Sequence, residues 1–163
     1  LMIDMALEKD LKMFFRQPLA NELNEPVIEM IRHPRAVCTF SDSGAHVSQI
    51  MDSSLQTPLL SYWVREKEAM SLEEGVRQIT YDTATLWGLH DRGLIREGLA
   101  ADLVVFDPET IGANLPEIVH DLPAGEKRIK QTATGIKNTI VNGDVLLENN
   151  EYTGATSGRL LRN

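Results

Sequence analysis

The segment that most constrains the fold is a short apolar run that ends in a cluster of small and polar residues. Ala36–Phe40 is rich in strand-forming residues, and the sequence Ser-Asp-Ser-Gly-Ala-His follows it directly at positions 41–46. A continuous apolar run is typical of a strand buried on both faces, as in a parallel sheet. Gly44 then indicates a sharp change of direction. The run predicts an α/β fold with Asp42 at the carboxyl end of a buried strand, where α/β barrels carry their catalytic groups.

Helical patterns surround this run. Asn24-Glu25-Pro26 offers an N-cap with proline in the first turn, and Pro34 should end that helix at His33. Ser71 followed by Glu74 is the pattern of a capping box. Together with the spacing of apolar residues, these signals predict helices over residues 3–15, 24–33, 61–70, 71–81 and 83–89.

The pattern becomes mostly β after residue 91. Leu103–Phe106 reads as a strand, and 116–131 reads as a loop. Residues 136–141 and 144–148 flank Asn142-Gly143, the preferred two-residue turn of a β-hairpin, because both turn positions need positive φ. We therefore expect two domains, residues 1–92 and 93–163.

Length and composition exclude several classes of protein. The chain has 163 residues, fewer than the roughly 250 of a complete eight-stranded barrel. With 16 basic and 24 acidic residues its net charge is −8, which argues against a nucleic-acid partner. It contains no apolar run of membrane-spanning length, and its start does not have the pattern of a signal peptide, so we expect none; its single cysteine, Cys38, suits a reducing compartment, and we expect a cytoplasmic protein. Because Leu1 is not Met and helical patterning starts at once, we expect the sequence to begin inside a larger protein.

Asp42 is the principal candidate for chemistry. At the end of a strand, its carboxylate could bind a divalent metal or take a proton from metal-bound water. The local sequence leaves open that it only caps a helix or stabilises a turn. Asp42-Ser43-Gly44 also matches the aspartic-protease motif, but that chemistry needs a second such carboxylate, hence a homodimer, and the surrounding helices fit it poorly.

The histidines do not complete a metal site. The four of them show neither His-x-His nor His-Glu-x-x-His spacing, so these 163 residues alone lack the three or four ligands of a transition-metal site. His46, four residues after Asp42, could contact a substrate carboxylate or orient Asp42, or it could be an ordinary loop residue. Cys38, inside the apolar run, is expected to be an unreactive core thiol.

Several segments resemble one enzyme family. Residues 32–46 resemble the last barrel strand of the D-aminoacylase (N-acyl-D-amino-acid deacylase) branch of the amidohydrolase superfamily. Residues 83–98 and 100–107 resemble the passage from that barrel into a small β-domain, and residues 141–143 and 153–161 resemble the end of that domain. The resemblance implies the last βα part of an incomplete TIM-like metal-dependent hydrolase barrel over 1–92, and a small β-sandwich-type domain over 93–163.

The resemblance also implies a function. The protein would be the carboxy-terminal fragment of a zinc-dependent enzyme that hydrolyses the amide bond of N-acyl-D-amino acids. Asp42 would lie at the zinc as a metal ligand and act as general base and acid, and His46 would lie near the substrate. The other zinc ligands of the family lie on earlier strands, so the isolated piece is expected to be inactive and to bind zinc weakly or not at all.

An incomplete barrel would also leave part of its surface uncovered. Open strand edges and exposed apolar side chains favour self-association, so we expect a homo-oligomer. The alternative functions are a fragment of a dihydropyrimidinase-like cyclic amidase, and a non-catalytic binding or assembly module.

Overall fold

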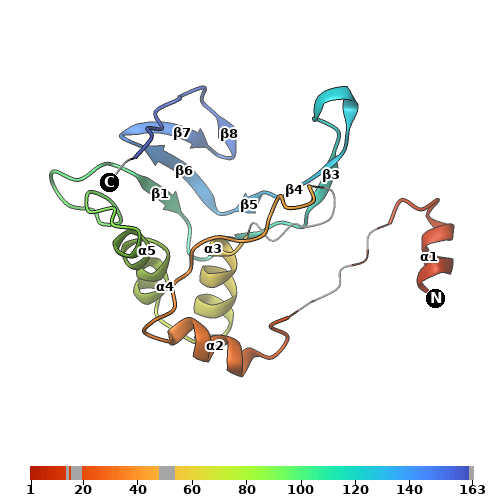
Figure 1. Cartoon of the computed structure of the whole chain (residues 1–163), viewed down its shortest axis with the longest axis horizontal. Coiled ribbons are helices and arrows are strands. Elements are labelled where there is room, and N and C mark those ends of the chain that lie inside the picture. Colours follow the sequence, from red (N-terminus) through yellow and green to blue (C-terminus); the bar gives the residue numbers. More distant parts are fainter. Residues whose placement is uncertain (14, 16–19, 48–53, 162–163) are drawn as a thin grey trace. The chain divides into compact units, whose positions relative to one another are not determined.

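The computed structural model describes residues 1–13, 15, 20–47 and 54–161 (Figure 1). The protein divides into two compact units, Leu1–Ala36 and Val37–Asn163. The division into these units is separate from the predicted domain boundary between residues 92 and 93. That boundary stays a prediction.

The first unit contains two helices. α1 (Met2–Glu8) is shorter than predicted, because Asp10 and Leu11 have positive φ and the backbone leaves the helix there. The predicted helix extended to Phe15, and Phe14 lies outside the described residues. α2 (Asn24–Arg32) has Leu23 rather than Asn24 at its N-cap. Its predicted end is confirmed, since His33 is extended with ψ 131° ahead of Pro34.

Helices at the start of the second unit form most of its core. They are α3 (Gln56–Pro58), the π-helix η1 (Leu59–Glu66), α4 (Leu72–Ile79) and α5 (Tyr81–Leu86). The predicted capping box of α4 is confirmed: the side chains of Ser71 and Glu74 each accept a hydrogen bond from the other's backbone N–H. The buried apolar residues among those described are Leu59, Leu60, Met70, Ala84 and Ile111.

The rest of the second unit forms small antiparallel sheets. The largest has the order β1-β6-β7-β8, from β1 (Leu103–Phe106), β6 (Ile136–Val141), β7 (Asp144–Glu148) and β8 (Glu151–Tyr152). The turn between β6 and β7 is the predicted one, with φ 49° at Asn142 and 91° at Gly143. A second sheet pairs β2 (Gly112–Ala113) with β5 (Ala133–Thr134), and a third pairs β3 (Glu117–Val119) with β4 (Arg128–Lys130).

Two further sequence predictions are wrong. Ala36–Phe40 is not a strand, and Val37 and Phe40 are exposed. A parallel strand exists only when neighbouring strands complete its hydrogen bonds, and every pairing among the described residues is antiparallel. The segment 116–131 is not a loop, because it forms the β3–β4 hairpin with a 3-10 turn, η2 (Pro123–Gly125), between the strands.

The observed fold class is therefore mixed α/β with small antiparallel sheets. The part of the protein that the structure describes contains no closed barrel. Nor does that part contain a helix with the length and apolar character needed to span a bilayer.

Candidate functional site

The main candidate residues lie on one turn, which we call the Asp42 loop (residues 41–47). The backbone C=O of Asp42 accepts a hydrogen bond from the N–H of Ala45 at 3.0 Å, and Ser41 Oγ accepts one from the N–H of Ser43 at 3.2 Å. Gly44 has φ 88°, a conformation that disfavours residues with a side chain. Asp42 and His46 are both exposed, so the turn presents a carboxylate and an imidazole to solvent.

The side chain of Asp42 is not engaged in the turn. Among the described residues it makes no hydrogen bond or ion pair, whereas the turn is closed by backbone groups and by Ser41. Capping or turn stabilisation by this carboxylate is therefore not what the structure shows. The carboxylate is accessible to a ligand.

Two hydrogen bonds connect the Asp42 loop, and the segment directly before it, to parts of the second unit that are distant in sequence. Thr83 Oγ1, on α5, donates to the C=O of Cys38 at 2.7 Å. The backbone N–H of Ile129, on β4, donates to the C=O of Val47 at 2.8 Å. Sequence reasoning did not identify either contact, because each joins residues that are far apart in the sequence.

The described residues do not form a metal site by themselves. No group of three or more His, Cys, Asp or Glu side chains gathers within residues 1–13, 15, 20–47 and 54–161. His33 and His120 are engaged with nearby backbone atoms instead, His33 Nδ1 with the N–H of Arg35 and His120 Nδ1 with the C=O of Gly125. A metal at Asp42 would need ligands from elsewhere.

Cys38 is half-buried, and burial raises the pKa of its thiol. A thiol is nucleophilic only as the thiolate. The prediction of an unreactive thiol agrees with this direction, although Cys38 lies in an irregular segment and not in a strand.

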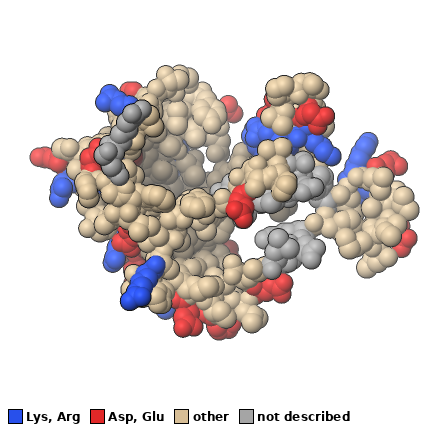
Figure 2. Space-filling view, viewed as in Figure 1, with Lys and Arg blue, Asp and Glu red and all other residues tan. Residues whose placement is uncertain are grey.

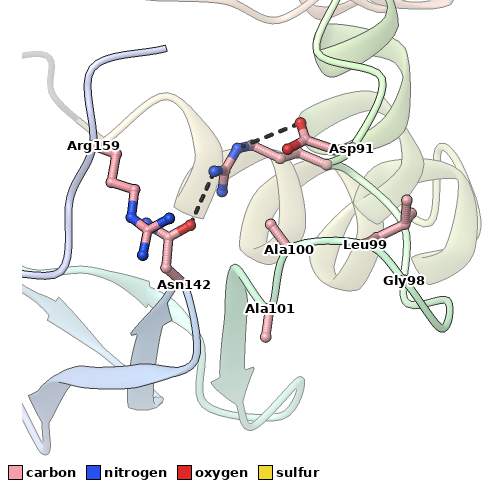
Figure 3. Close-up of a pocket in the computed structure, with 8 residues that line it drawn as sticks. Asp91, Gly98, Leu99, Ala100, Ala101, Asn142 and Arg159 are labelled. Carbon is pink, nitrogen blue, oxygen red and sulfur yellow. Dashed lines mark hydrogen bonds and ion pairs between the residues drawn. The ribbon is translucent and has the colours of Figure 1, made fainter.

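A pocket of about 400 Å³ lies elsewhere in the second unit (Figure 3). Its lining comes from the connection between α5 and β1, from the β6–β7 turn and from the last described residues: Asp91, Arg92, Gly98, Leu99, Ala100, Ala101, Asn142 and Arg159. It does not include Asp42 or His46. No sequence pattern predicted this pocket, although most of its lining falls in the glycine-containing segment 91–107 that resembled the exit from a barrel.

The electrostatics of this pocket centre on Arg92. Its side chain is only 11% exposed and donates to Asp102 through Nη1 and to Asn142 Oδ1 at 2.9 Å through Nη2. Its Nε lies 3.7 Å from Asp91 and has no hydrogen-bond partner among the described residues. The carboxylate of Asp102 also accepts the N–H of Asn142 at 2.8 Å. The arginine is thus compensated by two carboxylates and joins the segment before β1 to the β6–β7 turn.

Comparison with known proteins identifies the family to which this chain belongs. The model of the amidohydrolase family matches residues 6–147, which include the Asp42 loop and most of the pocket lining. The chain belongs to the amidohydrolase family.

The relatives agree with the resemblance to the D-aminoacylase branch, which is confirmed. The chain is 34% identical over 103 residues to a D-aminoacylase of Alcaligenes xylosoxydans xylosoxydans, over 63% of this chain and 19% of that protein. It is 44% identical over 55 residues to an N-acyl-D-aspartate deacylase of the same organism, over 34% of this chain and 11% of the relative. The matched region thus spans no more than about a fifth of the length of these proteins.

Solved structures of D-aminoacylase are similar to part of the protein. One, described by its binuclear metal centre, matches with a TM-score of 0.54 and 33% identity, covering 66% of this chain and 21% of that one. A mutant D-aminoacylase in complex with CuCl2 matches with the same values. The shared region is therefore a part of a fold that extends well beyond it in those enzymes.

Proposed function

We propose that this chain is the carboxy-terminal part of a zinc-dependent N-acyl-D-amino-acid deacylase. Such an enzyme adds water across the amide bond and releases a carboxylic acid and a free D-amino acid. The observation that carries the proposal is an exposed, unengaged carboxylate, Asp42, on a tethered loop inside the matched family region. The relatives that match include deacylases of N-acyl-D-aspartate and N-acyl-D-glutamate.

Asp42 is proposed to move the protons of the reaction. A carboxylate positioned within hydrogen-bond reach can take a proton from the attacking water and give it to the leaving amine nitrogen. Its exposure leaves room for a substrate, since no described side chain occupies its oxygens. His46, exposed on the same loop, is proposed to contact the substrate.

Zinc is proposed as the cofactor. When bound, zinc lowers the pKa of a coordinated water towards neutrality. The binuclear metal centre of the related D-aminoacylase supports a metal requirement. Because the described residues do not make a complete ligand set, Asp42 would contribute to a centre whose other ligands lie outside these 163 residues, and this piece alone would be inactive.

The apolar surface supports a larger assembly. Phe40, Trp87 and Ile95 are 76%, 54% and 91% exposed. Large exposed apolar side chains of this kind favour burial against further protein. We therefore propose that the rest of the enzyme, or a second copy in a homo-oligomer, covers part of them, and that the enzyme acts in the cytoplasm on a small N-acyl amino acid.

The test uses the complete protein that contains this sequence. Hydrolysis of N-acetyl-D-amino acids with neutral and acidic side chains is measured, with the L-enantiomers as the control substrates. Asp42→Asn is expected to lower kcat by about 10²- to 10⁴-fold while most of the zinc is retained through the other ligands. Asp10→Asn, at an exposed aspartate of the first unit, is the matched control and should leave kcat unchanged.

Three outcomes would contradict the proposal. Wild-type kcat in Asp42→Asn would remove Asp42 from the mechanism. Turnover of a cyclic amide, with none of the N-acyl-D-amino acids, would make the enzyme a cyclic amidase. Stoichiometric zinc and measurable turnover in the 163-residue piece would show that it needs no outside ligands.

A further inference from the structure

The segment that carries Asp42 is tethered on both sides by groups that lie far away in sequence. We propose that the hydroxyl of Thr83 and the backbone N–H of Ile129 are positioning groups that hold the Asp42 loop in its working geometry. This inference rests on the proposed function, because it assumes that Asp42 handles a proton in the reaction.

The first tether gives the backbone C=O of Cys38 a hydrogen-bond donor, as a neighbouring strand would have done in a sheet. Thr83 Oγ1 donates to the C=O of Cys38 at 2.7 Å and also lies 2.9 Å from the C=O of Gln78, near the end of α4. Cys38 precedes Asp42 by four residues, in a segment that belongs to no sheet. The hydroxyl of Thr83 therefore holds the segment that precedes the Asp42 loop against α5.

The second tether follows from the register of the β3–β4 hairpin. Ile118 and Ile129 are opposite one another, and the N–H of Ile129 donates to Val47 instead of to β3. In an antiparallel pair, residues whose N–H and C=O groups point away from the partner strand form a non-hydrogen-bonded pair. The outer edge of β4 thus holds Val47, the residue directly after His46.

Residues 39–46 lie between the two tethers, with Asp42 and His46 among them. Inside this interval the turn contains the bonds of Asp42 with Ala45 and of Ser41 with Ser43, which set its local shape only. The two tethers set its place relative to α5 and β4. Since a displacement of about 1 Å can cost about 10²-fold in rate, losing a tether should reduce proton transfer without removing the carboxylate.

The first experiment measures steady-state kinetics on the complete protein. Thr83→Val keeps the shape of the side chain and removes the hydroxyl, Thr83→Ser restores the hydroxyl, and Thr85→Val is the matched control at an exposed position of the same helix. We expect kcat to fall by about 10- to 100-fold in Thr83→Val, with KM within about twofold of wild type. Thr83→Ser should recover most of kcat, and Thr85→Val should match wild type. Equal kinetics in Thr83→Val and Thr85→Val would overturn the role of Thr83.

The second experiment tests the other tether and does not depend on Thr83. Ile129→Pro removes the N–H that binds Val47 and no bond to β3, while Ile118→Pro removes the outward N–H on the opposite edge of the same hairpin. We expect a loss of kcat in Ile129→Pro and none in Ile118→Pro. Equal kcat in the two variants would overturn the role of Ile129.

A third measurement, on the complete protein, needs no turnover. Deuterium exchange of the backbone amides of residues 39–47, followed by mass spectrometry, should be faster in Thr83→Val and Ile129→Pro and stay unchanged in the two control variants. Unchanged values in all four variants would overturn the inference even if a variant were too unstable for kinetics.

The proposed function and this inference fail in different ways. Wild-type turnover in Asp42→Asn defeats the proposed role of the carboxylate, and the tethers then have nothing to position. An inactive Asp42→Asn beside fully active Thr83→Val and Ile129→Pro variants defeats only this inference.

Discussion

Gly135 lies against the backbone of Ile111 so closely that a Cβ on Gly135 would be 2.5 Å from the Ile111 nitrogen. Gly135 also has φ 82°, and its C=O accepts a hydrogen bond from the N–H of Asp107 at 2.8 Å. Ile111 is 2% exposed and belongs to the small core of the second unit. The glycine between β5 and β6 thus allows the sheet strands to approach the segment that follows β1.

Gly135→Ala should destabilise the protein by more than the backbone strain of a left-handed alanine alone. The left-handed conformation costs an alanine about 1 kcal/mol, and the contact with buried backbone adds to it, so we expect about 3 kcal/mol or more in total. Urea unfolding followed by circular dichroism measures the change. Gly154→Ala is the matched control, because Gly154 has φ 89° and nothing within 4 Å of its Cβ position. Equal losses in the two variants would mean that the contact with Ile111 adds nothing.

The capping box of α4 gives a second prediction. Ser71→Ala removes the acceptor for the Glu74 N–H at 3.2 Å, and we expect it to lower the free energy of unfolding by about 1 kcal/mol. Glu74→Ala removes the reciprocal bond at 2.9 Å and should cost a similar amount. Glu73→Ala, in the same first turn but outside the box, is the control. If the double variant loses the full sum of the two single losses, the bonds act independently and the reciprocal arrangement is not cooperative.

The Arg92–Asp102 pair gives a third prediction. Asp102→Asn leaves the nearly buried guanidinium of Arg92 without its main counter-charge, while Asp91 remains 3.7 Å from Nε. Removing one partner of a buried pair costs about 3–5 kcal/mol. Because Asp102 is 34% exposed, solvent screening reduces this to about 2 kcal/mol, measurable by urea unfolding.

An exposed ion pair serves as the control for that variant. Arg128 holds the pKa of the Asp121 carboxyl below its usual range through a hydrogen bond at 2.6 Å. Basic side chains gather in the region of this hairpin, open to solvent (Figure 2). Asp121→Asn should therefore cost less than Asp102→Asn, and its cost should vanish at high salt or at acid pH, where Asp121 is protonated in both the folded and unfolded states. A larger loss in Asp121→Asn would contradict the ranking by burial.

The elements that were predicted correctly from the sequence depend on residues close together in it. The capping box is set by residues three apart, the β6–β7 turn by two adjacent residues with positive φ, and the end of α2 by the proline after His33. Residues 36–40 and the β3–β4 hairpin depend on what lies beside them. Apolar composition alone could not tell a strand from an irregular segment held by Thr83, and the short strands of the hairpin lack a strong pattern.

The same distinction applies to the candidate site. Asp42 and His46 were identified by a local motif, and the structure places both on one exposed turn. The tethers from Thr83 and Ile129, and the pocket around Arg92, join segments that are far apart in sequence and have no local signature. The roles of Asp42 in catalysis and of His46 in substrate binding stay predictions.

The reactivity of Cys38 gives the fourth prediction. Burial raises the pKa of this thiol, so a smaller fraction is thiolate at any given pH than in a free cysteine. Because the thiolate is the reacting form, alkylation by iodoacetamide near pH 8 should be slower than for free cysteine. The midpoint of the rate-against-pH curve should lie above the midpoint for free cysteine under the same conditions. Mass spectrometry reports the reaction directly, since Cys38 is the single cysteine of the sequence.

The control for Cys38 is the same protein unfolded in guanidinium, where burial is lost. Its alkylation rate should then match that of free cysteine at every pH, because nothing in the unfolded state disfavours the thiolate. A folded rate equal to the unfolded rate would show that residues around Cys38 open readily to solvent. Such opening would contradict a tethered segment next to the Asp42 loop, since Cys38 carries the C=O that Thr83 binds.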